Sequence, residues 1–198
     1  MQVRSPRALT LHVRGTLPRR GIAIVGSRTP PAEAATFAYD LARKLAEPIV
    51  SGLAPGIDVA AHRGALSAGA PTVASVGYGF GTTDPPEHAE LESAIVAGGG
   101  AVATLLSPGT PASPESLIAR DRLQAEHARA VVLICSEIGG GAMHTMRFAK
   151  ELDKPRFAVL PREEVKSRPE WAGNLVCITE GATPLPFDLK AAMDLLRS

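Results

Sequence analysis

The sequence predicts an α/β fold with three layers, α/β/α, around a mostly parallel sheet of about six to seven strands. Short runs rich in β-branched residues alternate with longer Ala- and Leu-rich amphipathic stretches, which is the pattern of successive βαβ units. Several of the short runs are apolar throughout, as in AVVLIC, so helices should cover both faces of the sheet. The 198 residues suffice for one compact domain.

The expected strands are short apolar runs, most of which stop at a glycine, proline or polar residue. They are Ile22–Val25, Pro48–Ser51, Thr72–Val76, Ala101–Thr104, Ala130–Cys135 and Arg156–Leu160, with a possible seventh at Leu175–Thr179. The expected helices repeat apolar residues every three or four positions. They are Ala32–Ala46, Ile57–Ala68, Glu87–Ala97, Glu115–Ala128, Met143–Leu152 and a last one near Leu189–Leu195.

Charge is distributed unevenly along the chain. The formal net charge is only +1, but residues 1–32 contain six arginines and no acidic residue, whereas residues 33–198 carry a net charge of −5. We therefore expect residues 1–19 to form a basic N-terminal arm or appendage to a domain spanning residues 20–198. Two interpretations of the arm stay open: a solvated, frayed segment, or a local positive field that attracts a phosphate chain.

The composition also bears on where in the cell the protein is expected. Two cysteines are too few for a disulfide scaffold, and no apolar stretch approaches the roughly 20 residues of a membrane span. No apolar segment typical of a secretory signal follows the basic N-terminus. We expect a cytoplasmic protein that does not bind a membrane.

The motifs that could carry function follow the strands, at the edge where an open parallel sheet binds its ligands. After the first expected strand, Gly26 permits a tight turn, Ser27 offers a hydroxyl, and Arg28 is a phosphate donor near a helix N-terminus. The second strand leads into a glycine-rich turn whose amides could face an anion. Its candidate residues are Ser51, Gly52, Leu53, Ala54, Gly56, Asp58 and His62.

Two of these candidates, Asp58 and His62, could have a structural role instead of binding a ligand. Asp58 lies in the first turn of the next helix, where it could offset the helix dipole or cap free amides. His62 is more often a packing residue than a base. The remaining candidates precede or follow the fifth strand, and they are Arg120, Arg122, Gly140, Gly141 and Thr145. Together these loops predict a phosphate-binding crevice with no catalytic residue, no metal and no cofactor.

Several common sites are not encoded. The first strand is followed by neither a Walker A loop nor a G-x-G-x-x-G run, and no G-x-S-x-G elbow is present. His144 has no carboxylate or cysteine at metal-ligand spacing. These observations argue against ATPase, dinucleotide-binding and metal-dependent classes.

The motifs resemble the DNA-processing protein A (DprA/Smf) family, within the wider group of lysine-decarboxylase-like Rossmann folds. The segment SGLAPGIDVAAHRGAL, Ser51–Leu66, matches the most diagnostic family signature, and Ile22–Arg28, Thr72–Leu91 and Gly173–Leu185 resemble other family segments. The similarity covers roughly residues 20–187. It implies a Rossmann-like core that binds single-stranded DNA without catalysis, during DNA recombination and natural transformation. It also implies a homodimer and, as a possible partner, a RecA-type recombinase.

By position, the resemblance assigns strand contact first to Arg28, with Ser27 and the Gly52–Gly56 backbone as supporting donors and Arg120 and Arg122 as second-rank candidates. The sequence departs from the family in places. Asp121 replaces the usual Asn, and adds a negative charge between two arginines. The small helical and winged-helix domains of many relatives are not in this sequence.

Two other functions stay open. The first is a nucleotide sensor or nucleotide-processing enzyme of the same Rossmann group. Phosphoribohydrolases of that group resemble P-G-G-x-G-T-x-x-E in the fifth-strand loop, and Phe148 occupies the Glu position here, which argues against glycosidic hydrolysis. The second is an interaction module whose crevice no longer binds a ligand.

Overall fold

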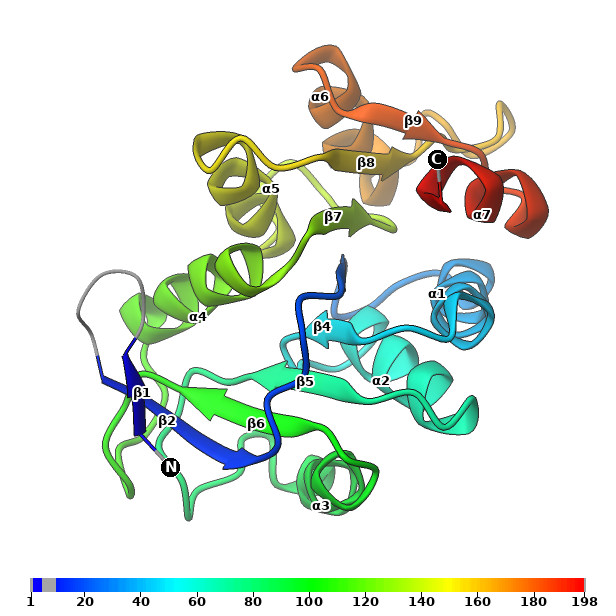
Figure 1. Cartoon of the computed structure of the whole chain (residues 1–198). Coiled ribbons are helices and arrows are strands. Elements are labelled where there is room, and N and C mark those ends of the chain that lie inside the picture. Colours follow the sequence, from blue (N-terminus) through cyan, green and yellow to red (C-terminus); the bar gives the residue numbers. More distant parts are fainter. Residues whose placement is uncertain (1, 5–9, 198) are drawn as a thin grey trace.

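A computed structural model describes residues 2–4 and 10–197. Strands and helices alternate through most of this region (Figure 1). The strands are β1 (Gln2–Arg4), β2 (Thr10–Gly15), β3 (Ile22–Val25), β4 (Ile49–Ser51), β5 (Thr72–Ser75), β6 (Ala101–Thr104), β7 (Ala130–Leu133), β8 (Arg156–Val159) and β9 (Thr183–Leu185). The α-helices are α1 (Ala32–Leu45), α2 (Ile57–Ser67), α3 (Ala89–Ala97), α4 (Pro114–His127), α5 (Ala142–Glu151), α6 (Ala172–Thr179) and α7 (Leu189–Arg197), and short 3-10 helices span Pro86–His88 and Pro169–Trp171.

The strands of the described region form one sheet in the order β1-β2-β6-β5-β4-β3-β7-β8-β9. From β6 to β9 every neighbouring pair is parallel, whereas β2 runs antiparallel to β6 and to β1. The chain moves outward from β3 in one direction to β6, and returns to the other side of β3 to build β7, β8 and β9. The sheet order therefore reverses between β3 and β7, which is where ligands bind in open α/β sheets.

Helices cover both faces of the sheet because its central strands are apolar on both faces. Every residue of β3 and β7 is buried. On one face, Ile22 and Ile24 of β3 pack against α1, α2 and α7. On the other, Ala23 and Val25 belong to the core that includes residues of α4, α5 and α6. Figure 1 shows α1, α2, α3 and α7 on one side of the sheet and α4 and α5 on the other. The predicted three-layer fold is confirmed.

Three strands were not expected from the sequence, and the first of them is β1 (Gln2–Arg4), which pairs with β2. Thr10–Gly15 forms β2, whose alternating Leu11 and Val13 are buried, so this segment is not a frayed, solvated arm. The last parallel strand is β9 rather than Leu175–Thr179. The prediction of a strand at Leu175–Thr179 is wrong, since these residues lie in α6. Arg7 and the side chain of Arg4 lie outside the described residues.

Local sequence fixes the start of α4. Ser113 is its N-cap, and the Ser113 Oγ accepts a hydrogen bond from the Ser116 amide (3.1 Å), while Pro114 occupies the first turn. The Ser116 hydroxyl also donates to the Gly77 carbonyl (2.6 Å) beyond the end of β5. These contacts fix the N-terminal turn of α4 against the sheet edge. Among the described residues, no helix is long and apolar enough to cross a membrane.

Candidate nucleic-acid interface

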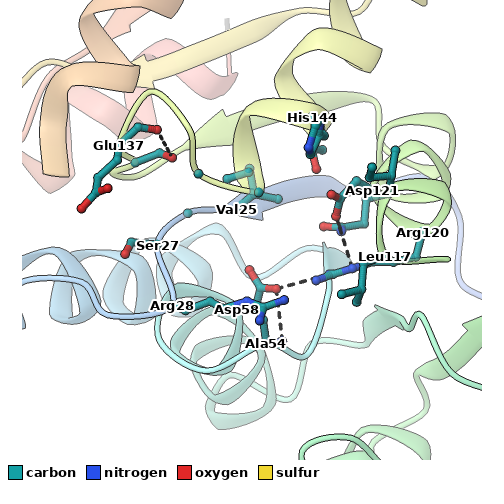
Figure 2. Close-up of a pocket in the computed structure, with 18 of the residues that line it drawn as sticks. Val25, Ser27, Arg28, Ala54, Asp58, Leu117, Arg120, Asp121, Glu137 and His144 are labelled. Atoms are coloured by element: carbon teal, nitrogen blue, oxygen red, sulfur yellow. Dashed lines mark hydrogen bonds and ion pairs between the residues drawn. The ribbon is translucent and has the colours of Figure 1, made fainter. Parts of the chain in front are cut away.

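A cavity of about 540 Å³ lies at the carboxyl edge of the sheet, where the strand order reverses. Its walls come from the loop after β3, the turn before α2, the inner side of α4 and the glycine turn that leads into α5 (Figure 2). A smaller cavity of about 160 Å³ adjoins the turn after β4. Arg28, Ala54, Leu117 and Arg120 line both. The predicted convergence of loops is therefore present.

The loop after β3 provides the accessible cation. Gly26 permits close packing there, because a Cβ at this position would lie 2.7 Å from Ile57 and 2.9 Å from the Cys135 carbonyl. The Ser27 amide donates to that carbonyl (2.8 Å), and the Ser27 Oγ accepts from the Thr29 amide (3.1 Å). Arg28 is exposed and makes no hydrogen bond or ion pair with other described residues. Its charge helps to lower the pKa of Asp121, but no carboxylate of the described residues pairs with its guanidinium, which can therefore bind an anion.

The turn after β4 is already occupied by an internal anion. Asp58 Oδ2 accepts hydrogen bonds from the amides of Gly52 (3.1 Å) and Ala54 (3.2 Å). Asp58 therefore holds the turn before α2 rather than the amides at the start of that helix, which has no side-chain cap, and the amides of Gly52 and Ala54 are not free phosphate donors. Gly56 has a φ of 81°, a conformation that favours glycine, and its role is to make the turn that leads into α2.

Arg120 lies between two buried carboxylates (Figure 2). Its Nη1 is 3.5 Å from Asp58 Oδ2, and its Nε is 3.2 Å from Asp121 Oδ1. All three side chains are less than 10% exposed. Burial raises the pKa of Asp58, and Arg120 opposes that effect. Burial also raises the pKa of Asp121 to about 6, against the lowering effect of Arg120, while Asp58 raises it further. The charge of Arg120 is thus largely balanced within the protein.

Four candidates from the second motif line neither cavity, namely Ser51, Leu53, Gly56 and His62. The hydroxyl of Ser51 donates to the Ile24 carbonyl (2.7 Å), and Leu53 is fully buried in the core. His62 Nδ1 lies 2.8 Å from Thr72 Oγ1, and burial is the main reason that its pKa falls to about 3. The side chains of Ser51, Leu53 and His62 are buried and contact only other parts of the protein. The prediction that they contact a ligand is wrong.

Arg122 also points away from the cavity. Its Nε donates to Glu126 (3.1 Å), its Nη1 donates to Glu151 (2.9 Å), and its guanidinium lies 5.1 Å from the centroid of the Phe148 ring. It therefore joins α4 to α5 rather than facing a ligand. The prediction of an Arg122–phosphate contact is wrong because residues two apart on a helix face different directions.

The turn into α5 forms part of the cavity wall. Gly140, Gly141 and Thr145 line the larger cavity. A Cβ on Gly140 would lie 2.3 Å from the Ser136 hydroxyl, so this turn has no room for a side chain at that position. The start of this loop is held by buried Asn174, whose Oδ1 accepts from the Ser136 amide (3.0 Å) and whose Nδ2 donates to the Ile134 carbonyl (2.9 Å).

Sequence reasoning missed several wall residues, namely Gln124, Ser136, Glu137 and His144. Gln124 could have been found, because it lies three positions after Asp121 and shares its helix face. Its Nε2 donates to Asp121 Oδ1 (3.1 Å). Within residues 2–4 and 10–197, no group of His, Cys, Asp and Glu could hold a metal ion.

Comparison with solved structures identifies close matches to this fold. DNA processing protein A from Streptococcus pneumoniae superposes with a TM-score of 0.85 and 28% identity, covering 96% of this chain and 67% of that one. A structure that describes the single-stranded DNA binding mode of DNA processing protein A from Helicobacter pylori gives a TM-score of 0.81. It is 23% identical and covers 95% of this chain and 86% of that one.

Comparison of the sequence with curated proteins and with family models gives the same result. The putative DNA processing protein DprA of Mycobacterium tuberculosis is 38% identical over 143 residues, which are 71% of this chain and 36% of the relative. The chain thus spans about a third of the length of that curated relative. The model of the DNA recombination-mediator protein A family matches residues 3–196. Because this match includes both the Ser51–Leu66 motif and the strands around the cavity, the chain belongs to the DNA recombination-mediator protein A family, as the DprA/Smf resemblance predicted.

Proposed function

We propose that this chain binds single-stranded DNA without catalysis, at the cavity between β3 and β7. The observation that carries the proposal is the position of Arg28, an exposed guanidinium on the border of both cavities with no ion-pair partner among the described residues. A relative in the same family, from Helicobacter pylori, is described as a single-stranded DNA-binding protein. Arg28 would contact the phosphate backbone, which positions a strand without reading its sequence.

The number of phosphate contacts should be small. Asp58 and Asp121 balance Arg120, and Glu126 and Glu151 pair with Arg122, so neither arginine is available as a free cation. Each phosphate contact with a single strand contributes a slope of about −0.7 to a log–log plot of affinity against salt concentration. One or two contacts therefore predict modest affinity and a shallow salt dependence.

The hydrolase alternative lacks the glutamate of the phosphoribohydrolase motif. Phe148, at the position where phosphoribohydrolases have Glu, is buried under the guanidinium groups of Arg122 and Arg147, each 5.1 Å from its ring centroid. A side chain packed in this way cannot support the charge that develops during glycosidic cleavage.

Three further proposals rest on family membership: assembly as a homodimer, contact with a RecA-type recombinase, and a cytoplasmic location where DNA is available. Size-exclusion chromatography with light scattering tests the first, and co-sedimentation with recombinase filaments tests the second.

Fluorescence anisotropy tests the binding function. A labelled single-stranded 20-mer is titrated with the full chain at two salt concentrations, with the duplex and a free mononucleotide as competitors. We expect the single strand to bind and the duplex to compete at least several-fold less well. If the free mononucleotide competes as well as the unlabelled single strand at the same concentration of nucleotides, the result would favour the sensor function. No binding to the single strand at low salt would refute the proposal.

A further inference from the structure

Arg120 shares its single positive charge between two buried carboxylates. Its Nη1 lies 3.5 Å from Asp58 Oδ2 and its Nε lies 3.2 Å from Asp121 Oδ1, and all three side chains are less than 10% exposed. If both carboxylates were ionised, this cluster would hold one uncompensated negative charge away from bulk water. Burying such a charge costs free energy, and a buried carboxylate avoids that cost by taking up a proton.

Hydrogen bonds decide which of the two carboxylates the proton favours. Asp58 Oδ2 accepts from the amides of Gly52 (3.1 Å) and Ala54 (3.2 Å), and such donors stabilise the charged form of a carboxylate. For Asp121 the corresponding donor is one side-chain amide, that of Gln124 (3.1 Å). Burial raises the pKa of Asp121 to about 6. Asp121 is therefore the member of the pair that changes charge near neutral pH.

Asp121 and the proposed phosphate contact influence each other through Arg28. Burial raises the pKa of Asp121, whereas the positive charges of Arg120 and then of Arg28 lower it. A phosphate bound to Arg28 would cancel the effect of that guanidinium and would itself repel an ionised carboxylate. The bound strand therefore favours the protonated form of Asp121. Coupling between two bound species is reciprocal, so a proton on Asp121 strengthens strand binding by the same factor.

Other ionisable groups share the cavity with Asp121 (Figure 2). They come from α2, α4, the loop after β3, the loop after β7 and α5, and they are Asp58, Arg120, Arg28, Glu137 and His144. Glu137 is exposed, unlike Asp58 and Asp121. Histidine side chains generally change charge between pH 5 and pH 8, so His144 needs a variant of its own in any test of pH dependence.

We propose that Asp121 couples strand binding to proton uptake: the single strand binds more tightly when Asp121 is protonated, and the complex takes a proton from solvent onto this carboxylate as it forms. This inference rests on the proposed function. Protonation removes one negative charge from the cavity wall, so the positive charges of Arg120 and Arg28 attract a phosphate more strongly. Affinity is therefore highest in mildly acidic solution, and it falls as the pH rises through about 6.

Anisotropy titrations at pH 5.5 and pH 7.5, at one fixed ionic strength, test the direction of the effect. The probe is a labelled single-stranded dT 20-mer, whose bases do not titrate in this range. We expect the full wild-type chain to bind about fivefold more tightly at pH 5.5 than at pH 7.5. Asp121→Asn is neutral at both pH values, so its affinity should change less than about twofold between them and should match that of wild type at pH 5.5.

Glu137→Gln is the matched control, because it removes a carboxylate from the same cavity but from an exposed position. It should raise the affinity at both pH values and preserve the difference between them. His144→Gln should preserve that difference as well. Loss of the pH dependence in His144→Gln, or its persistence in Asp121→Asn, would assign the effect to another group and overturn the inference.

Calorimetry measures the proton directly, and it covers the case in which Asp121→Asn fails to fold. The enthalpy of strand binding is measured at pH 6.5 in two buffers that differ in their enthalpy of ionisation. We expect wild type and His144→Gln each to take up about half a proton per bound strand. No uptake by wild type would refute the coupling while strand binding stood. Failure of the strand to bind at either pH would refute the proposed function, on which this inference rests.

Discussion

The guanidinium of Arg120 occupies the space that a side chain at Gly52 would need. A Cβ on Gly52 would lie 1.1 Å from Arg120 Nη1 and 2.4 Å from its Cζ. The glycine of the family motif therefore does more than turn the chain after β4. It makes room for a buried arginine from α4, and this arginine in turn pairs with Asp58 of α2 and with Asp121. The motif and α4 form one structural unit.

Substitution Gly52→Ala should displace Arg120 and break this unit. Separating a buried carboxylate from its cation, in addition to the steric clash, should lower the free energy of unfolding by about 2–4 kcal/mol. Denaturant titration measures the change. Gly139→Ala is the matched control, because a Cβ there would meet no atom within 4 Å, and its effect should stay within about 0.5 kcal/mol. Equal effects of the two substitutions would contradict the packing described here.

The replacement Asp121→Asn should stabilise the protein more at neutral than at acidic pH. Burial raises the pKa of Asp121 from 3.8 to about 6, so the fold disfavours its charged form. The contribution of Asp121 to stability is therefore greatest below pH 3.8 and is lost as the pH rises through about 6. Asn carries no charge at any pH, so the advantage of the variant should grow by about 1 kcal/mol between pH 5 and pH 7.5.

The measurement for Asp121→Asn is the free energy of unfolding at those two pH values. The other ionisable groups of the cavity, Asp58, Glu137, His144, Arg28 and Arg120, remain in both proteins, so the difference reports the loss of the Asp121 carboxyl together with its electrostatic interaction with Asp58. Exposed Asp194 on α7 supplies the surface control, Asp194→Asn. An advantage of Asp121→Asn that is the same at both pH values would count against burial as the cause.

The sequence was sufficient to predict the layers, the six central parallel strands and the edge that carries the cavity, because these depend on periodicity and on strand-to-helix turns. It was not sufficient at the sheet margins. Leu175–Thr179 is a short apolar run, and such runs suit a strand or a buried helix equally well. β9 was missed because it has three residues and contains Pro184, which is tolerated only at an edge.

Within the site, the sequence indicated which loops converge but not which donors stay free. Arg28 and Arg120 are equally cationic in the sequence, and only the packing shows that Arg120 has two carboxylate partners. The same applies to Gly52 and Ala54, whose amides bind Asp58. Partners distant in sequence decide these outcomes, as with Glu151, which pairs with Arg122 across two helices.

Arg14, which the solvated-arm interpretation left without a role, should contribute to stability. Its guanidinium pairs with Glu92, a carboxylate that is only 3% exposed and that also accepts hydrogen bonds from Tyr78 (2.9 Å) and Thr83 (2.8 Å). Arg14→Met would leave this buried carboxylate without its cation, and should lower the free energy of unfolding by about 1–2 kcal/mol.

The control for Arg14→Met is Arg43→Met, which breaks an exposed pair with Asp40 one helical turn away. Exposed pairs of this kind contribute little, so its effect should stay below about 0.5 kcal/mol. Thermal or denaturant unfolding compares the two variants. If Arg14→Met were as mild as Arg43→Met, β2 would not be anchored to α3 through Glu92.

The central claim is that the strand binds where Arg28 borders the two cavities, and a pair of arginine variants tests it most directly. Arg28→Ala and Arg63→Ala remove the same charge from exposed positions, but Arg63 on α2 lines neither cavity. In anisotropy titrations with a single-stranded 20-mer at low salt, we expect Arg28→Ala to weaken binding at least fivefold with an unchanged melting temperature, and Arg63→Ala to bind within twofold of wild type. Equal affinities of Arg28→Ala and wild type would contradict the claim.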